Sequence, residues 1–238
     1  MNAFILAAGL GTRLRPLTDT MPKALVPVDG KPLLQYQIER LKAAGFQRIV
    51  VNVHHFAEQI IDFLNAHQNF GLDIRISDER EQLLETGGAI KRALPLFSDS
   101  SPILVHNVDI LHNLDLRSFY QQNCAQQTDA TLLVSQRTTS RYLLTDDTNR
   151  LLGWRNVKTG EVKGKEGEQA YAFSGIHLFS PSLGSLMENW PDRFSIIDFY
   201  LQTTLTRNIH LAPVADLRLL DVGKVDSLHE ATRFLQDL

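Results

Sequence analysis

A short stretch near the amino terminus combines glycines with a hydroxyl group and positive charges: Gly9, Gly11, Thr12, Arg13, Arg15 and Lys23. At a glycine no side chain shields the backbone N–H, so an anion can approach closely. Three cations this near to one another repel each other unless an anion lies between them. The combination predicts a binding site for a polyphosphate. The alternative, a plain loop with solvated arginines, gives no reason for so many glycines and arginines together.

The spacing of these residues excludes two common phosphate-binding motifs. Leu14 stands where the dinucleotide-binding pattern G-x-G-x-x-G requires its third glycine. The P-loop pattern, G-x-x-x-x-G-K followed by Ser or Thr, is not matched either. The predicted phosphate site is therefore of another type.

Two aspartates each follow a predicted buried strand. Asp109 comes after the apolar residues 103–105, and Asp221 comes after residues 217–220. Mg²⁺ in proteins is usually bound by one or two carboxylates together with substrate phosphates. If both strands end at one edge of the sheet, the two side chains form such a site. Each aspartate is also a suitable loop-capping residue, and the spacing alone does not decide between these interpretations.

The amino-terminal residues resemble a known family signature. Residues 6–18, LAAGLGTRLRPLT, followed by residues 21–25, MPKAL, are similar to the signature of the sugar-1-phosphate nucleotidyltransferases. The resemblance continues along nearly the whole chain. Within that family, the sequence is most similar to the short enzymes that uridylylate N-acetylmuramate 1-phosphate. Those enzymes lack the carboxy-terminal β-helix of longer relatives, and we expect none here.

The resemblance implies a role for each matching position. A nucleoside triphosphate would lie on the loop after the first strand, with Arg13 and Lys23 as the catalytic residues on its phosphates. Asp109 and Asp221 would hold Mg²⁺. The residues implied to bind the substrates are Leu6, Ala8, Gly9, Gly11, Thr12, Glu85, Gly87, Gly88, Asn107, Asn156 and Gly175.

Three of these assignments come with local expectations. We expect Thr86 to be the N-cap of a helix and the two glycines after it to leave room for a flat nucleobase. A capped helix start without a ligand is the alternative. We expect Gly175 to let the sugar approach a strand and Asn156 to lie near the sugar phosphate, although residues 154–158 also suit a solvated hairpin.

One position departs from the family pattern. The family usually has glycine immediately before the first metal-binding aspartate, and this chain has Val108. A β-branched residue does not readily adopt a positive φ. If the family turn needs that conformation, we expect the turn before Asp109 to differ.

The activity that the resemblance implies is nucleotidyl transfer from a nucleoside triphosphate to a sugar 1-phosphate, with UTP and N-acetylmuramate 1-phosphate as the preferred pair. Guanylyl transfer to mannose or heptose 1-phosphate and cytidylyl transfer to phosphocholine would use the same phosphate machinery. A catalytically silent nucleotide-sugar sensor is the alternative outside enzymes. The presence of Lys23, Asp109 and Asp221 favours an enzyme over such a sensor.

The order of predicted elements indicates the fold. Apolar runs at residues 3–8, 48–53, 73–77 and 103–105 alternate with amphipathic helices at 32–44, 57–65 and 88–93. This alternation predicts a Rossmann-like α/β fold with a mostly parallel mixed sheet flanked by helices. Residues 137–169 predict hairpins or a loop, and the later predicted elements are strands at 130–136, 172–179 and 217–220 and helices at 182–189, 196–207 and 225–238. We expect one domain, with a nucleotide-binding half at about 1–128 and a smaller sugar-covering half at about 129–238.

The composition excludes several classes of protein. Among 238 residues, 24 Lys and Arg stand against 27 Asp and Glu, which argues against a nucleic-acid partner. No apolar run reaches the ~20 residues that cross a bilayer, and the apolar start is too short for a signal peptide. A single cysteine, Cys124, excludes an intrachain disulfide and a CxxC metal site. We expect a cytoplasmic protein, and the sequence leaves the oligomeric state open.

Overall fold

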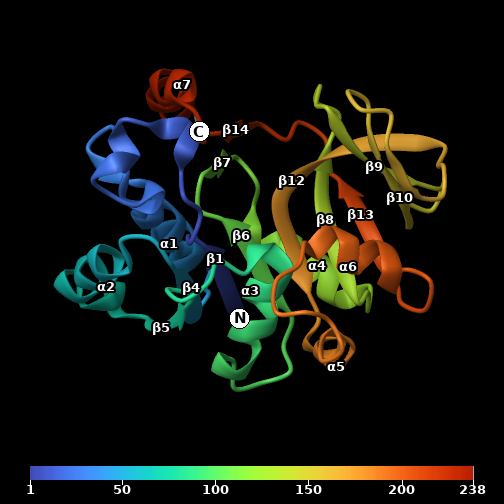
Figure 1. Ribbon diagram of the computed structural model, residues 1–238, viewed down its shortest axis with the longest axis horizontal. Coiled ribbons are helices and arrows are strands. Elements are labelled where there is room, and N and C mark those ends of the chain that lie inside the picture. The colour runs from blue at the N-terminus through green and yellow to red at the C-terminus, as the bar shows by residue number, and fades with distance from the viewer. Residues whose placement is uncertain (238) are drawn as a thin grey trace.

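A ten-stranded mixed sheet forms the centre of the molecule in the computed structural model, which describes residues 1–237 (Figure 1). Four strands of the first half are parallel, in the order β5-β4-β1-β6. Their bounds are β1 (Asn2–Leu6), β4 (Arg48–Val53), β5 (Asp73–Asp78) and β6 (Ile103–Asn107). Parallel strands end at the same edge, so the segments after β1 and β6 leave the sheet side by side.

The second half extends this sheet with antiparallel pairs. The long strand β12 (Gln169–Phe179) runs antiparallel to β6 and pairs with β8 (Ala130–Ser135) and β9 (Arg141–Thr145). The predicted hairpins of residues 137–169 are confirmed as β9, β10 (Leu151–Asn156) and β11 (Val162–Gly164). The strand β13 (Ile209–Pro213) lies parallel to β8. The predicted mixed sheet is therefore confirmed, and its parallel strands lie mainly in the first half.

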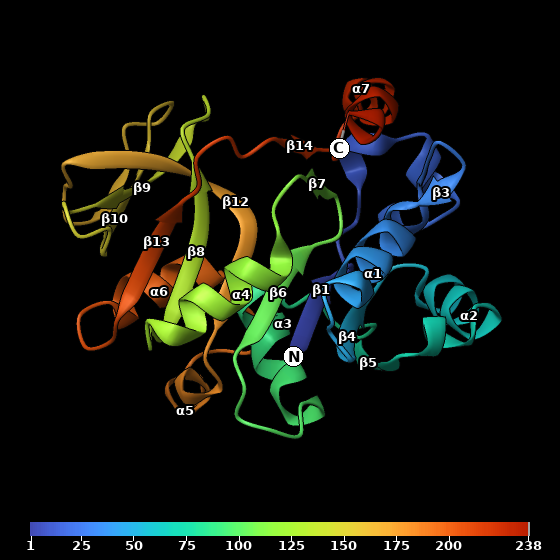
Figure 2. The same cartoon turned by 180° about the vertical axis from the view of Figure 1, so that it is seen from behind.

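Helices cover both faces of the sheet. Along β1, Ala3 and Ile5 face one apolar core and Phe4 faces the other, because successive side chains of a strand point to opposite faces. The first core contains α1 (Leu33–Ala43), α2 (Ala57–Ala66) and α4 (Leu116–Ala125); α1 and α4 face the viewer in Figure 2. The second contains α3 (Glu85–Ala93), α5 (Gly184–Met187) and α6 (Ile196–Thr203). Burial on both faces explains the continuous apolar runs of the strands.

The carboxy-terminal segment crosses back to the first half of the chain. After β13, the strand β14 (Leu219–Asp221) pairs antiparallel with β7 (Ile110–His112), and α7 (Val225–Gln236) follows (Figures 1 and 2). Ala231 of α7 belongs to the same core as α1, and α7 contacts β2 (Pro27–Val28), which pairs with β3 (Lys31–Pro32). The boundary predicted near residue 128 therefore does not divide the molecule in space. The last residue of the predicted final helix lies outside the described residues.

Some predicted ends differ from the ends in the structure. The first strand ends at Leu6 and not at residue 8, because the N–H groups of Ala7 and Ala8 donate to the Asn52 side chain instead of a neighbouring strand. The predicted helix 196–207 ends at Thr203.

No helix in the described part of the chain is long and apolar enough to span a bilayer.

Candidate functional site

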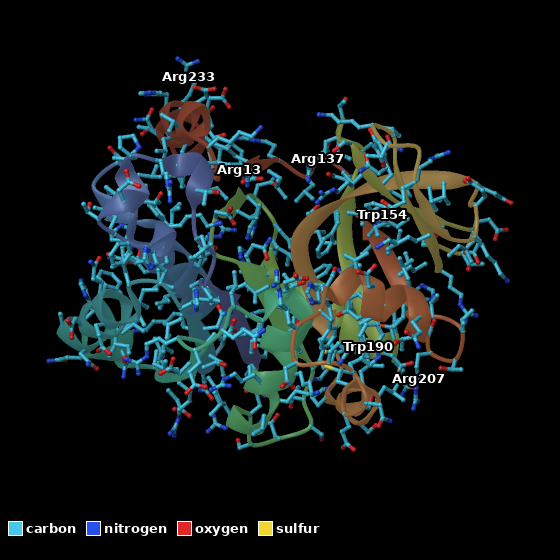
Figure 3. All side chains as sticks on the ribbon, in the orientation of Figure 1. Arg13, Arg137, Trp154, Trp190, Arg207 and Arg233 are labelled. Atoms are coloured by element: carbon cyan, nitrogen blue, oxygen red, sulfur yellow. The ribbon has the colours of Figure 1, made fainter. Side chains whose placement is uncertain are left out.

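A pocket of about 330 Å³ opens where β1 and β6 end. It brings together nine of the residues implicated by the sequence: Leu6, Ala8, Gly9, Arg13, Lys23, Glu85, Asn107, Asp109 and Asp221. Six others do not line it: Gly11, Thr12, Gly87, Gly88, Asn156 and Gly175. In Figure 3, Arg13 lies on the side of the molecule where β14 crosses between the two halves. The chemistry-bearing residues from both ends of the chain thus meet at one edge of the sheet.

The two aspartates converge because β14 pairs with β7. Asp221 lies opposite Ile110, and the N–H of Val222 donates to the Asp109 carbonyl oxygen at 2.8 Å. A β-carbon at Gly223 would lie 2.7 Å from Asp221 Oδ1 and 3.1 Å from Asp109 Oδ2. Both carboxylates therefore border the same small space next to this glycine.

Two cations share that space. Lys23 Nζ donates to Asp109 Oδ2 at 2.6 Å, and both side chains are largely buried. The same hypothetical β-carbon at Gly223 would lie 2.7 Å from a terminal guanidinium nitrogen of Arg13. A buried carboxylate is costly unless a positive charge accompanies it. Lys23 supplies that charge to Asp109.

The donor set fits a hard divalent cation. Asp109 and Asp221 offer carboxylate oxygens, and no cluster of three or more metal-ligating side chains exists within residues 1–237. Mg²⁺ retains several water molecules and typically takes one or two carboxylates plus substrate phosphates. Two converging carboxylates in an open pocket match that requirement. A site formed wholly by protein ligands would need more.

Val108 is compatible with the turn before Asp109. Its φ is not in the left-handed region, and its side chain is fully buried in the first core. The N–H of Val108 donates to the Leu6 carbonyl oxygen at 3.2 Å. The buried Gln37 donates its amide to the carbonyl oxygens of Val108 and Ile110 at 3.3 and 2.8 Å. Gln37 thus fixes the turn that carries Asp109.

The glycine at position 11 is required by its local geometry. Gly11 has a φ of +65°, and a β-carbon there would lie 2.9 Å from the Thr18 methyl group and 3.0 Å from Lys23 Cβ. Thr18 Oγ1 donates to the Gly11 carbonyl oxygen at 2.8 Å. A side chain at position 11 would therefore crowd both Thr18 and Lys23.

Two residues that line the pocket were assigned no individual role from the sequence. Asn52 Oδ1 accepts hydrogen bonds from the N–H groups of Ala7 and Ala8 at 2.6 and 3.1 Å. Asn52 Nδ2 donates to Glu79 Oε1 at 2.7 Å, and Glu79 Oε2 accepts from the Leu84 N–H at 3.2 Å. Burial raises the pKa of the Glu79 carboxyl. The available signal was a single amide in the otherwise apolar run of residues 49–53.

This Asn52–Glu79 bridge connects the loop after β1 with the segment that leads into α3. Both side chains line the pocket. Because Asn52 occupies the N–H groups of Ala7 and Ala8, these two donors already have an acceptor within the protein. The bridge therefore shapes the wall of the pocket.

The segment at the start of α3 differs from expectation. Thr86 is not the N-cap of its own helix; its Oγ1 accepts from the N–H of Ile196 at the start of α6, at 3.0 Å. A β-carbon at Gly87 would lie 2.4 Å from the Phe194 ring, and one at Gly88 would lie 2.0 Å from the Asp192 carbonyl oxygen. The two glycines therefore leave room for the chain at residues 192–194.

Gly175 and Asn156 lie in different surroundings. Gly175 has a φ of +74° at an irregularity of β12, and a β-carbon there would lie 2.7 Å from Asn107 Nδ2. It thus borders the pocket through Asn107. Asn156 lines a separate pocket, and its Oδ1 accepts from the Lys158 N–H at 3.0 Å, as in a hairpin turn.

A family model described as nucleotidyl transferase matches residues 2–237. The chain belongs to the nucleotidyl transferase family. It is 53% identical over 109 residues to an N-acetylmuramate alpha-1-phosphate uridylyltransferase of Caulobacter vibrioides, a match that covers 45% of each chain. The matched stretch is thus under half the length of that relative.

Two further comparisons cover nearly the whole chain. A D-glycero-alpha-D-manno-heptose 1-phosphate guanylyltransferase of Aneurinibacillus thermoaerophilus is 27% identical over 242 residues, or 99% of both chains. The crystal structure of HddC from Yersinia pseudotuberculosis complexed with GMP-PN superposes with a TM-score of 0.78 at 24% identity. That superposition covers 98% of this chain and 99% of the other, and it confirms the fold.

Proposed function

We propose that this protein transfers a uridylyl group from UTP to N-acetylmuramate 1-phosphate and releases pyrophosphate. The observation that carries the proposal is the meeting of Arg13, Lys23, Asp109 and Asp221 in one pocket where β1 and β6 end. Membership of the nucleotidyl transferase family supports the reaction class. The similarity to the Caulobacter enzyme supports this choice of base and sugar.

The chemistry requires charge neutralisation more than proton transfer. The nucleophile, a phosphate oxygen of the sugar 1-phosphate, is already an anion, so no general base is needed. The attack at the α-phosphorus and the departure of pyrophosphate bring several negative charges together. Arg13 and Lys23 would neutralise charge on the triphosphate and on the leaving pyrophosphate.

Asp109 and Asp221 would hold Mg²⁺ at the point where their carboxylates converge. When bound, Mg²⁺ supplies positive charge to the phosphates and orients them. Lys23 contacts Asp109 through an ion pair of 2.6 Å, so its ammonium lies within the same group of charges as the proposed metal ligands. Lys23 would balance Asp109 before the substrates arrive and contact phosphate afterwards.

Guanylyl transfer to a heptose 1-phosphate is a second candidate. The heptose 1-phosphate guanylyltransferase aligns with 99% of this chain, although at lower identity. The phosphate-binding residues would serve either base, so the difference between the candidates lies in the substrates alone.

The test is a screen of the four nucleoside triphosphates against sugar 1-phosphates, including N-acetylmuramate, N-acetylglucosamine, mannose and heptose 1-phosphates. Pyrophosphate release is measured with Mg²⁺ present, and Asp221→Asn serves as the inactive control. We expect turnover with UTP and N-acetylmuramate 1-phosphate. Turnover with GTP and a heptose 1-phosphate would replace the first candidate by the second. No turnover with any pair would refute both.

A further inference from the structure

A second pocket, of about 500 Å³, lies in the hairpin half of the molecule. It is built from β9, β10, β12 and the start of α6. Trp154 and Phe173 give it aromatic surfaces, and Arg137 and Arg141 add two guanidinium groups. In Figure 3, Arg137 and Trp154 both lie in this half, with Arg137 on the side nearer to Arg13.

The charges of this pocket are not fully paired within the protein. Its two carboxylates both contact Lys163: Asp198 at 2.8 Å and Glu161 at 3.9 Å. Over residues 1–237, neither Arg137 nor Arg141 forms an ion pair; Arg137 donates only to the Phe173 carbonyl oxygen, at 2.9 Å. The two guanidinium groups are therefore available to an acidic group on a ligand.

The second pocket adjoins the candidate active site through two connections. Phe173 precedes Gly175 by two residues on β12, and Gly175 lies against Asn107 of the first pocket. Thr86, which lines the first pocket, accepts from the N–H of Ile196. The neighbours of Ile196 in the sequence, residues 195 and 197, line the second pocket. The walls of the two pockets are thus connected through β12 and the start of α6.

The lining selects a chemical class for the part of the ligand in the second pocket. A guanidinium group forms paired hydrogen bonds with a carboxylate in a fixed planar geometry. Aromatic side chains provide flat apolar surfaces against the carbon atoms of a ring. A sugar ring that carries a carboxylate matches both features. N-acetylmuramate differs from N-acetylglucosamine by such a group, a lactyl ether.

We propose that Arg137 and Arg141 determine specificity by binding the carboxylate of an acidic sugar 1-phosphate whose phosphate lies in the first pocket. This inference rests on the proposed function and extends it, because it assigns the choice of sugar to named residues outside the phosphate-binding group. Trp154 and Phe173 hold the sugar between the two charged ends.

The experiment compares two acceptors that differ only in the lactyl ether, N-acetylmuramate 1-phosphate and N-acetylglucosamine 1-phosphate. The variants are Arg141→Gln, Arg137→Gln and the double substitution. The matched control is Arg155→Gln, because Arg155 lies on β10, pairs with Glu166 at 3.7 Å and does not line the pocket. Arg141→Lys retains the charge without the planar pair of donors.

We expect Arg141→Gln to lower kcat/KM for the muramate substrate about 10- to 100-fold, through a higher KM. The loss of a hydrogen bond to a charged group weakens binding by about this factor. The glucosamine substrate should change less than about 2-fold, as should both substrates with Arg155→Gln. Arg141→Lys should give an intermediate KM. An equal loss for both substrates would overturn the proposal, because the arginines would then hold the shared 1-phosphate. An unchanged selectivity would overturn it as well.

Failure of the proposed function gives a different result. If the wild-type protein turns over neither acceptor, calorimetric binding of the two sugar phosphates to the wild-type protein and Arg141→Gln still tests the pocket. Tighter binding of the muramate compound that is lost in Arg141→Gln supports the carboxylate site. Equal binding of both compounds refutes it.

Discussion

Exchanging the two partners of the Asn52–Glu79 bridge tests its hydrogen-bond directions. The two backbone donors, Ala7 and Ala8, face Asn52 Oδ1, so Asn52 Nδ2 must donate to Glu79. In the double variant Asn52→Asp/Glu79→Gln, the aspartate accepts from the same N–H groups and from the new glutamine amide. The glutamine oxygen accepts from the Leu84 N–H. Every bond and the total charge are preserved.

Each single variant leaves the bridge incomplete. Asn52→Asp places two carboxylates against each other, and Glu79→Gln directs an amide donor at another donor. Asn52 and Glu79 are 3% and 2% exposed, so water does not readily replace a lost partner. A buried polar group without a partner costs about 1–3 kcal/mol. We therefore expect each single variant to lose about 2–4 kcal/mol of unfolding free energy, since one or two groups lose their partners.

Urea denaturation at neutral pH measures the double-mutant cycle. We expect the double variant to unfold within about 1 kcal/mol of the wild-type protein, with a coupling energy of at least about 2 kcal/mol. Asn52→Ala is the control for simple loss of the bridge. If the double variant is as unstable as the sum of the single variants, the assigned donor and acceptor directions are wrong.

Three further predictions concern the active site and the core. Lys23→Ala and Asp221→Asn should each lower kcat by ~10²–10³ with smaller effects on triphosphate binding, and near-normal pyrophosphate release would exclude these roles. Gly223→Ala places a methyl group 2.7 Å from Arg13 and Asp221. We therefore expect kcat to fall by about 10²-fold and Mn²⁺ binding to weaken, while the thermal unfolding temperature stays unchanged. Intact Mn²⁺ binding would contradict the convergence of the two aspartates. Burial lowers the pKa of His177 from 6.5 to about 3, and no described group bonds its ring nitrogens. The stability contributed by this neutral histidine is complete above pH 6.5 and is lost as the pH falls toward 3, by up to about 1.4 kcal/mol per pH unit. His177→Phe should therefore flatten the acid limb of urea stability between pH 6 and 4, and an unchanged slope would argue against a buried neutral imidazole.

The sequence by itself determined the elements that are local in the chain. The predicted strands at 48–53 and 103–105 are mostly apolar on both faces, because a sheet covered by helices buries both sides of a parallel strand. This pattern is visible in the sequence of each strand alone, without knowledge of the strands and helices that pack against it. The glycines and cations after the first strand predicted a phosphate pocket for a similar reason: the type and density of residues carry the chemistry. Likewise, Asp109 and Asp221 each follow a strand predicted from the sequence, although β14 in the structure includes Asp221.

The tertiary structure decided which distant segments meet. No local pattern indicates that β14 pairs with β7, and this pairing alone brings Asp221 to Asp109. Gly87 and Gly88 are compatible with several roles in the sequence, and only the approach of residues 192–194 shows what fills the space beside them. The sequence likewise does not indicate that Asn156 lines a second pocket, which only the packing of β9, β10 and β12 shows. Contacts between remote residues depend on the path of the whole chain, so neither residue type nor spacing can specify them.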